Sequence, residues 1–295
     1  MNICISSTFV GRDGYGLVTR ILDAVAEGKL PGITVSAVIS TRESGDDKTS
    51  DQLLARLHEA YPDVPIIAYS AKQHGRIKRK PSEKEKDLYD LAILERLGAA
   101  DLNIMVGDMI IKGPEWCRKL PSLNLHPDLP LSLGGTEGMY WEVIGKWVRD
   151  GRGEIGGMMH LAIPTLDAGT PIAYFRLPAR GTVNGVDLAP LWDTLPKEPD
   201  KREALIQQQV ALKDKPTHRL FVELRRAEAA FEQRLVLSTI TMFAQDELGI
   251  QEGRVVDKNG QPLENGLDIT EWVVDGAAVW PGGESSGKSR SPETQ

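Results

Sequence analysis

Two polar side chains, Asn124 and His126, stand two residues apart at the end of a stretch that is typical of a β-strand, Ser122–Leu125. Side chains at i and i+2 of a strand point to the same side of a sheet. If Asp167, on a later loop, joins them, an amide, an imidazole and a carboxylate could stabilise an oxyanion and move a proton. Pro127 ends the strand, so we predict a strand-end site, where open α/β sheets place their ligands.

A glycine-rich stretch near the N-terminus follows a short predicted strand, Ile3–Ser6, and precedes apolar residues at helical spacing in Leu17–Ala26. Free backbone N–H groups and the helix dipole at such a junction form a site for anions. The pattern is neither G-x-G-x-x-G nor a Walker A sequence, so it does not indicate a dinucleotide or a nucleoside triphosphate. It predicts a phosphate site, with a plain strand–helix loop as the alternative, at Gly11, Arg12, Asp13, Gly14, Tyr15 and Gly16.

These candidate residues are carried by alternating elements. Strand-like runs lie at Ile3–Ser6, Thr34–Ser40, Val64–Tyr69, Leu102–Val106, Ser122–Leu125, Met158–Ile163 and Ile172–Arg176. Helix-like runs lie at Leu17–Ala26, Ser50–Ala60, Lys84–Leu97 and Met139–Arg149. Such alternation predicts an α/β fold, with a mostly parallel twisted sheet and helices on both faces.

The composition changes from about Thr182 onward. Helix-like runs at Lys201–Leu212 and Thr217–Leu248 precede a turn, Asp257–Gly260, between strand-like segments that end at Trp272–Val274. We therefore predict a catalytic domain over 1–181, a C-terminal extension of helices and a β-hairpin over 182–280, and a disordered tail over 281–295. The helical pair would cover the active site, form a homodimer interface or complete the core.

Composition restricts the function. The 295-residue chain has 41% hydrophobic and 26% charged residues, as a globular enzyme does, and its net charge of −7 argues against a nucleic-acid partner. No apolar stretch approaches the ~20 residues that span a membrane. Cys4 and Cys117 have no metal or disulfide spacing, which favours buried thiols in a cytoplasmic protein and no metal site. The basic cluster His74–Lys80 is either a solvated loop or a grip for a phosphate or a polyglutamate tail.

Four motifs in one order carry a resemblance to a known family. They are Val106-Gly107-Asp108-Met109, Asn124-Leu125-His126-Pro127, a histidine at His160, and Leu166-Asp167-Ala168-Gly169, in which the aspartate follows that histidine by seven residues. Over about residues 1–178 this pattern resembles the folate-dependent formyltransferase family, most closely its phosphoribosylglycinamide members. The resemblance implies the Rossmann-like formyltransferase fold.

The resemblance also implies roles for individual residues. Asn124, His126 and Asp167 would be catalytic: Asn124 and protonated His126 would bind the oxyanion, and Asp167 would favour the imidazolium and relay a proton. The glycine-rich stretch would hold the substrate phosphate. The donor would be 10-formyltetrahydrofolate, with no metal. Its pterin would lie against Met109, Ile110, Ile111, Ile163, Pro164, Thr165 and Leu166.

The acceptor implied by the resemblance is a small phosphorylated amine, glycinamide ribonucleotide of purine biosynthesis. An amino sugar nucleotide or methionyl-tRNA would be alternatives in the same class, although the acidic C-terminal third disfavours tRNA. A 10-formyltetrahydrofolate hydrolase is a further alternative. Such deformylases carry a regulatory domain before the first strand, whereas here the first strand begins at Asn2, which disfavours the hydrolase. A non-catalytic binding protein would be expected to have lost part of the catalytic trio.

Overall fold

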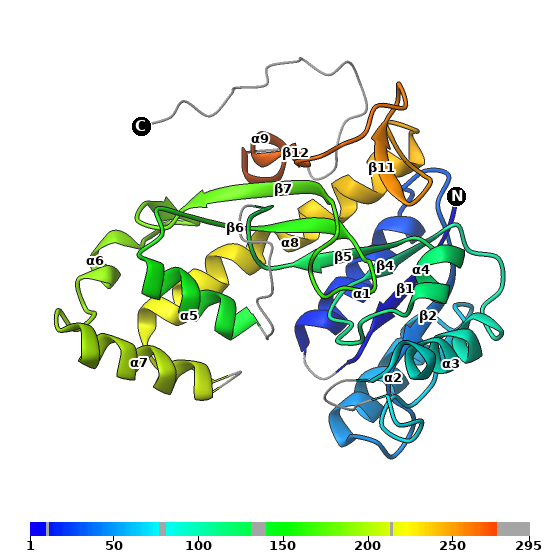
Figure 1. Ribbon diagram of the computed structural model, residues 1–295, viewed down its shortest axis with the longest axis horizontal. Helices are drawn as coiled ribbons and strands as arrows, with labels where there is room; N and C mark the ends of the chain where they lie inside the picture. The colour runs from blue at the N-terminus through cyan, green and yellow to red at the C-terminus, as the bar shows by residue number, and fades with distance from the viewer. Residues whose placement is uncertain (10–11, 77–80, 131–139, 213–214, 276–295) are drawn as a thin grey trace.

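The computed structural model describes residues 1–9, 12–76, 81–130, 140–212 and 215–275, with only the backbone at Arg12, Asp13 and Asp275. In this part of the chain an eight-stranded sheet has the order β12-β7-β6-β5-β4-β1-β2-β3 (Figure 1). Its strands are β1 (Asn2–Ser7), β2 (Thr34–Ser40), β3 (Ile66–Ala68), β4 (Leu102–Met105), β5 (Ser122–His126), β6 (Glu154–Leu161), β7 (Pro171–Pro178) and β12 (Leu267–Asp268).

The pairing within the sheet is mostly parallel, as predicted. The strands β1 to β5 pair in parallel, and so do β7 and β12. The exception is β6, which is antiparallel to both β5 and β7. Two small hairpins lie outside this sheet: β8 (Thr182–Val183) with β9 (Val186–Asp187), and β10 (Leu248–Gln251) with β11 (Arg254–Asp257).

Helices cover both faces of the sheet. They are α1 (Arg12–Ala26), α2 (Lys48–Ala60), α3 (Glu83–Leu94), α4 (Pro114–Lys119), α5 (Tyr140–Asp150), α6 (Ala189–Trp192), α7 (Pro199–Ala211), α8 (Arg219–Ala244) and α9 (Thr270–Asp275). Ile3 and Ile5 of β1 join the main core with α1, α5 and α8, whereas Cys4, which points the other way, packs in a second core with α3 and α4.

The long helix α8 is part of the core and not a separate appendage. It runs along β6 and β7 (Figure 1), and 18 of its side chains are buried, including Leu224 in the same cluster as Ile5. Completing the core, one of the three roles that we considered for the helical pair, is therefore a role that α8 has. None of the helices in the described ranges combines the length and the apolar character that a bilayer crossing requires.

Several predicted elements differ from the structure. The helix predicted over Thr217–Leu248 ends at Ala244, and Leu248 already lies in β10. The glycine-rich stretch is not a loop before a helix at Leu17, because α1 already begins at Arg12. The strand β6 begins at Glu154, four residues before the predicted Met158, and includes two glycines. Trp272–Val274 lies in α9 and not in a strand: the Asp268 carboxylate accepts the Thr270 N–H at 3.1 Å and thereby begins a helical turn. The predicted disordered tail, 281–295, lies outside the described residues.

Candidate functional site

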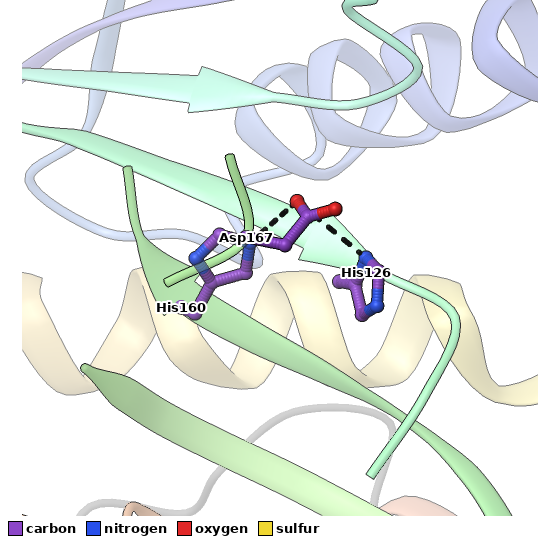
Figure 2. A group of neighbouring side chains, drawn as sticks. All are labelled: His126, His160 and Asp167. Carbon is purple, nitrogen blue, oxygen red and sulfur yellow. Dashed lines mark ion pairs between the residues drawn. The ribbon is translucent and has the colours of Figure 1, made fainter. Parts of the chain in front are cut away.

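The end of β5 brings three polar side chains together, and a fourth comes from β6. Asn124 and His160 are register partners in the antiparallel β5–β6 pair, and Asn124 Nδ2 lies 3.0 Å from His160 Nε2. Asp167, on the loop after β6, lies between the two imidazoles (Figure 2). Its Oδ1 is 3.7 Å from His126 Nδ1 and 3.6 Å from His160 Nε2. The predicted trio is thus joined by a second histidine.

Hydrogen bonds assign the tautomer of His160. Its Nδ1 lies 3.1 Å from the Leu161 carbonyl oxygen, which can only accept, so Nδ1 carries the proton. Nε2 is then the acceptor for one N–H of the Asn124 amide. His160 therefore fixes the orientation of that amide, and the amide retains a second N–H for a ligand.

Burial and charge set the protonation of His126 and Asp167. Desolvation lowers the pKa of His126 below its ordinary 6.5, although the Asp167 carboxylate acts in the opposite direction. Burial would raise the pKa of Asp167, but His160 and His126 together hold it below its usual 3.8. At neutral pH the resting site therefore has an ionised Asp167 and a neutral His126. His126 would therefore become protonated only during the reaction, because at rest desolvation outweighs the attraction of Asp167.

The backbone of the Asp167 loop approaches β6 closely. Asp167 has φ +47°, in the left-handed region, and Gly169 passes beside the end of the strand. A Cβ at Gly169 would lie 1.6 Å from the Leu161 carbonyl oxygen and 3.4 Å from His160 Nδ1. Any larger residue at position 169 must therefore displace the loop that carries Asp167.

We expect Gly169→Ala to lower both stability and activity, because this contact cannot be relieved without moving the loop. The free energy of unfolding should fall by about 1–3 kcal/mol, the usual cost of overpacking, and the catalytic rate should fall with it. Urea unfolding and a steady-state assay measure both. Gly153→Ala is the matched control, since its Cβ would meet no atom within 4 Å. Wild-type stability and rate in Gly169→Ala would contradict the close approach.

The site opens into a cavity of about 890 Å³, within the range of small-molecule sites. Six of the seven predicted pterin-contacting residues line it: Met109, Ile110, Ile111, Ile163, Thr165 and Leu166. Pro164 does not; its carbonyl oxygen instead accepts a hydrogen bond from Lys86 Nζ at 3.3 Å. Asn124, His126, His160 and Asp167 also lie in the cavity wall. The predicted donor residues and the predicted catalytic residues thus share one cavity.

The structure describes only part of the predicted phosphate site. Gly14 and Ser7 line the cavity, at the end of β1 and the start of α1. A Cβ at Gly14 would come within 2.8 Å of Ser7 Oγ, so a larger residue here would have to displace the Ser7 hydroxyl. Tyr15 and Gly16 lie in α1 and are not in the cavity wall, Arg12 and Asp13 are described only by their backbone, and Gly11 lies outside the described residues. A phosphate at this corner remains a prediction.

Solved structures share this architecture. Glycinamide ribonucleotide transformylase 1 from Symbiobacterium toebii matches 86% of this chain over 92% of its own, with 22% identity and a TM-score of 0.56. The phosphoribosylglycinamide formyltransferase from Coxiella burnetii has 19% identity and a TM-score of 0.57, over 91% of this chain and 98% of its own. This chain has the formyltransferase fold. No protein-family model and no curated protein matches it in sequence.

The same fold occurs in hydrolases. A formyltetrahydrofolate deformylase from Pseudomonas putida has 17% identity and a TM-score of 0.51. The match covers 87% of this chain and 69% of the deformylase chain. Likeness at this level of identity establishes the formyltransferase fold and does not establish the reaction.

A buried ionic network supports the loop after β4, and Lys112 is not among the predicted site residues. Lys112 Nζ lies 2.8 Å from Asp108 Oδ2, with both side chains fully buried, and 4.4 Å from the Trp116 ring centroid. Asp108 also accepts the Ile110 N–H at 3.0 Å. Burial would lower the pKa of Lys112, but Asp108 and Asp90 raise it above 10.5, so the ammonium stays charged. Asp108 and Lys112 also belong to the cavity wall, and their pairing fixes the predicted pterin loop between them.

Further cavity residues come from α5, α8 and the segment before α8, and none of them was predicted. They are Tyr140, Trp141, Lys215, Arg225 and Glu232. A charged residue on an amphipathic helix usually faces solvent, so the sequence offers no signal that Arg225 and Glu232 face a cavity. They add charged groups to the cavity wall, to which Met109, Ile110 and Ile111 contribute apolar ones.

His126, His160 and Asp167 form the one group of potential metal ligands found among the described residues, with one ligand atom of each within 4.8 Å of the others. Two imidazoles and a carboxylate suit several transition metals. However, His160 Nε2 already accepts the Asn124 amide, so a metal there would have to displace this hydrogen bond. The hydrogen-bonded arrangement fits acid–base chemistry without that rearrangement.

Proposed function

We propose that this chain transfers a formyl group from 10-formyltetrahydrofolate to the primary amine of a small phosphorylated molecule, with glycinamide ribonucleotide of purine biosynthesis as the first candidate. The convergence of Asn124, His126 and Asp167 in one cavity of a formyltransferase fold carries the proposal. The apolar wall formed by Met109, Ile110 and Ile163 suits the flat pterin of the donor, whose formyl group would then lie beside His126.

In the proposed reaction the amine lone pair forms a new bond to the formyl carbon, and the carbonyl π electrons move to the oxygen. The second N–H of Asn124 donates to this oxyanion. His126, neutral at rest, takes the proton that the amine loses, and Asp167 stabilises the resulting imidazolium. The intermediate collapses when the bond from the formyl carbon to N10 of the folate breaks, and N10 takes up the proton from His126.

The cavity also favours transfer over hydrolysis. A hydrolase needs room only for the folate and a water molecule. Here the cavity of about 890 Å³ is also lined by the charged residues Lys215, Arg225 and Glu232, and by Ser7 and Gly14. These polar regions support the binding of a second substrate whose amine would reach the formyl carbon next to His126.

Release of tetrahydrofolate from 10-formyltetrahydrofolate tests the proposal, with glycinamide ribonucleotide present in one sample and absent from the other. We expect release only when the amine is present, together with stoichiometric formation of the formylated amine, measured by mass spectrometry. Equal release without the amine would replace the transferase with a hydrolase. Release that requires an amino sugar nucleotide instead would keep the reaction and change the acceptor.

A further inference from the structure

Three charged residues on α8 form a buried cluster that the proposed chemistry does not use. Arg225, Glu228 and Glu232 are spaced by three and four residues and therefore share one face of the helix, with relative exposures of 8%, 0% and 5%. Arg225 Nη1 donates to Glu228 Oε2 and, at 2.6 Å, to Glu232 Oε1. The guanidinium also lies 4.5 Å from the ring centroid of Tyr140. Arg225 is thus held from three sides.

Such a cluster is a poor way to stabilise a fold. Desolvating an arginine and two carboxylates costs free energy, and apolar residues of similar volume at such sites are often neutral or stabilising. The neighbouring strand also makes room for the cluster: a Cβ at Gly157 of β6 would lie 3.0 Å from Glu228 Oε1. The same Cβ would lie 3.5 Å from the His126 carbonyl oxygen, so the cluster adjoins the catalytic end of β5. We therefore expect the cluster to have a function in the cavity.

Two of the three residues face that cavity. Arg225 and Glu232 line it, whereas Glu228 lies behind them against β6. Burial and the adjacent Glu232 raise the pKa of Glu228 well above 4.5. At Arg225 and Glu232 the wall thus presents donors of a guanidinium beside acceptors of a carboxylate, and these two opposite charges offset each other. This pair is complementary to an uncharged group that accepts and donates side by side.

We propose that Arg225 determines specificity for the acceptor amine by hydrogen-bonding an uncharged oxygen-bearing group of that molecule, a hydroxyl or an amide, and that Glu228 is a positioning residue for Arg225. This inference rests on the proposed transferase function. Glu228 lies behind the wall and accepts one hydrogen bond from the guanidinium. It thereby holds Arg225 so that Arg225 and Glu232 face the ligand.

The test compares Arg225→Met with wild type in the transfer assay, with glycinamide ribonucleotide as the acceptor. Loss of a hydrogen bond from a charged group should raise the KM for the acceptor about 10- to 150-fold. The KM for the folate donor and the kcat at saturating acceptor should stay within about threefold of wild type, because Arg225 lies away from the pterin wall. Arg226→Met is the matched control: Arg226 is the next residue, its side chain is 68% exposed, and it pairs with Glu223.

Glu228→Gln provides a second variant if Arg225→Met does not fold, since it keeps the shape and a hydrogen-bond acceptor. We expect it to raise the acceptor KM about 3- to 10-fold, less than the loss of Arg225 itself, because an amide N–H group replaces one carboxyl oxygen of Glu228 and disturbs the position of the guanidinium. A purely structural role of Glu228 would instead lower the melting temperature and leave the acceptor KM unchanged, which would overturn the positioning role.

Acceptor analogues distinguish a hydroxyl from an amide. If Arg225 binds the ribose hydroxyls, the 2′,3′-dideoxy analogue should bind wild type as weakly as the natural amine binds Arg225→Met, with no further loss in the combination. If Arg225 binds the amide instead, an analogue with an ester in place of the amide should bind wild type as weakly as the natural amine binds Arg225→Met. If wild type transfers the formyl group and folded Arg225→Met has an unchanged KM for the acceptor, this inference alone is overturned. Absence of transfer to any amine by wild type would overturn the proposed function and this inference together.

Discussion

Replacement of His126 by alanine is expected to lower kcat/KM for formyl transfer about 100- to 10,000-fold, the usual contribution of a positioned general acid–base. His126 is 5% exposed at the end of β5 and lies 3.7 Å from Asp167, so its imidazole can accept the proton of the attacking amine. Its low pKa keeps it neutral and ready for that role. Steady-state assay of the purified variant measures the loss, and calorimetry with tetrahydrofolate should still show binding.

His58→Ala is the control for the His126 experiment, because His58 is an exposed histidine on α2 that has no place in the cavity wall. It should retain wild-type activity. The decisive comparison is between rate and folate binding in His126→Ala. A variant that binds folate and turns over at close to the normal rate would remove His126 from the mechanism.

Replacement of Asp108 by asparagine is expected to destabilise the fold by about 3–5 kcal/mol, because it leaves the ammonium of Lys112 buried without its nearest counter-charge. The two side chains are fully buried and 2.8 Å apart. Urea unfolding measures the change. The loop that contains Met109 and Ile110 should also move, so the KM for the folate donor should rise in the same variant.

The double variant Asp108→Asn with Lys112→Met isolates the ionic interaction. If the loss in Asp108→Asn comes from the stranded charge, removal of that charge should restore most of the stability. Glu203→Gln is the control, because the Arg149–Glu203 pair is solvent-exposed and its loss should leave the unfolding midpoint unchanged. A double variant as unstable as Asp108→Asn would show that shape, and not charge, holds the loop.

Local patterns in the sequence were sufficient to predict much of the site. The two-residue spacing of Asn124 and His126, followed by a proline, placed both side chains at a strand end, where the structure has them in one cavity. The strand β2 was predicted with its observed bounds, because five of its seven residues are apolar or β-branched. These inferences depend only on the geometry of a single strand.

Other features depend on contacts between distant segments, and local patterns do not carry that information. Gly156 and Gly157 have low strand propensity, yet both lie in β6, and at Gly157 the space without a Cβ is used by Glu228 of α8. The role of His160 comes from the antiparallel pairing of β5 and β6. Arg225 has the charge of a surface residue, and only the packing of α8 on the sheet reveals that it lies in the cavity wall.

The pairing of Asn124 with His160 has a consequence for how this protein can diverge. The two residues face each other only in one register of β5 and β6, and a shift of one residue would turn His160 to the opposite face of the sheet. Insertions and deletions between the strands leave this pairing intact, whereas a single-residue deletion inside Met158–Leu161 would separate the amide from its imidazole. Descendants of this chain should therefore keep the length of β6 constant.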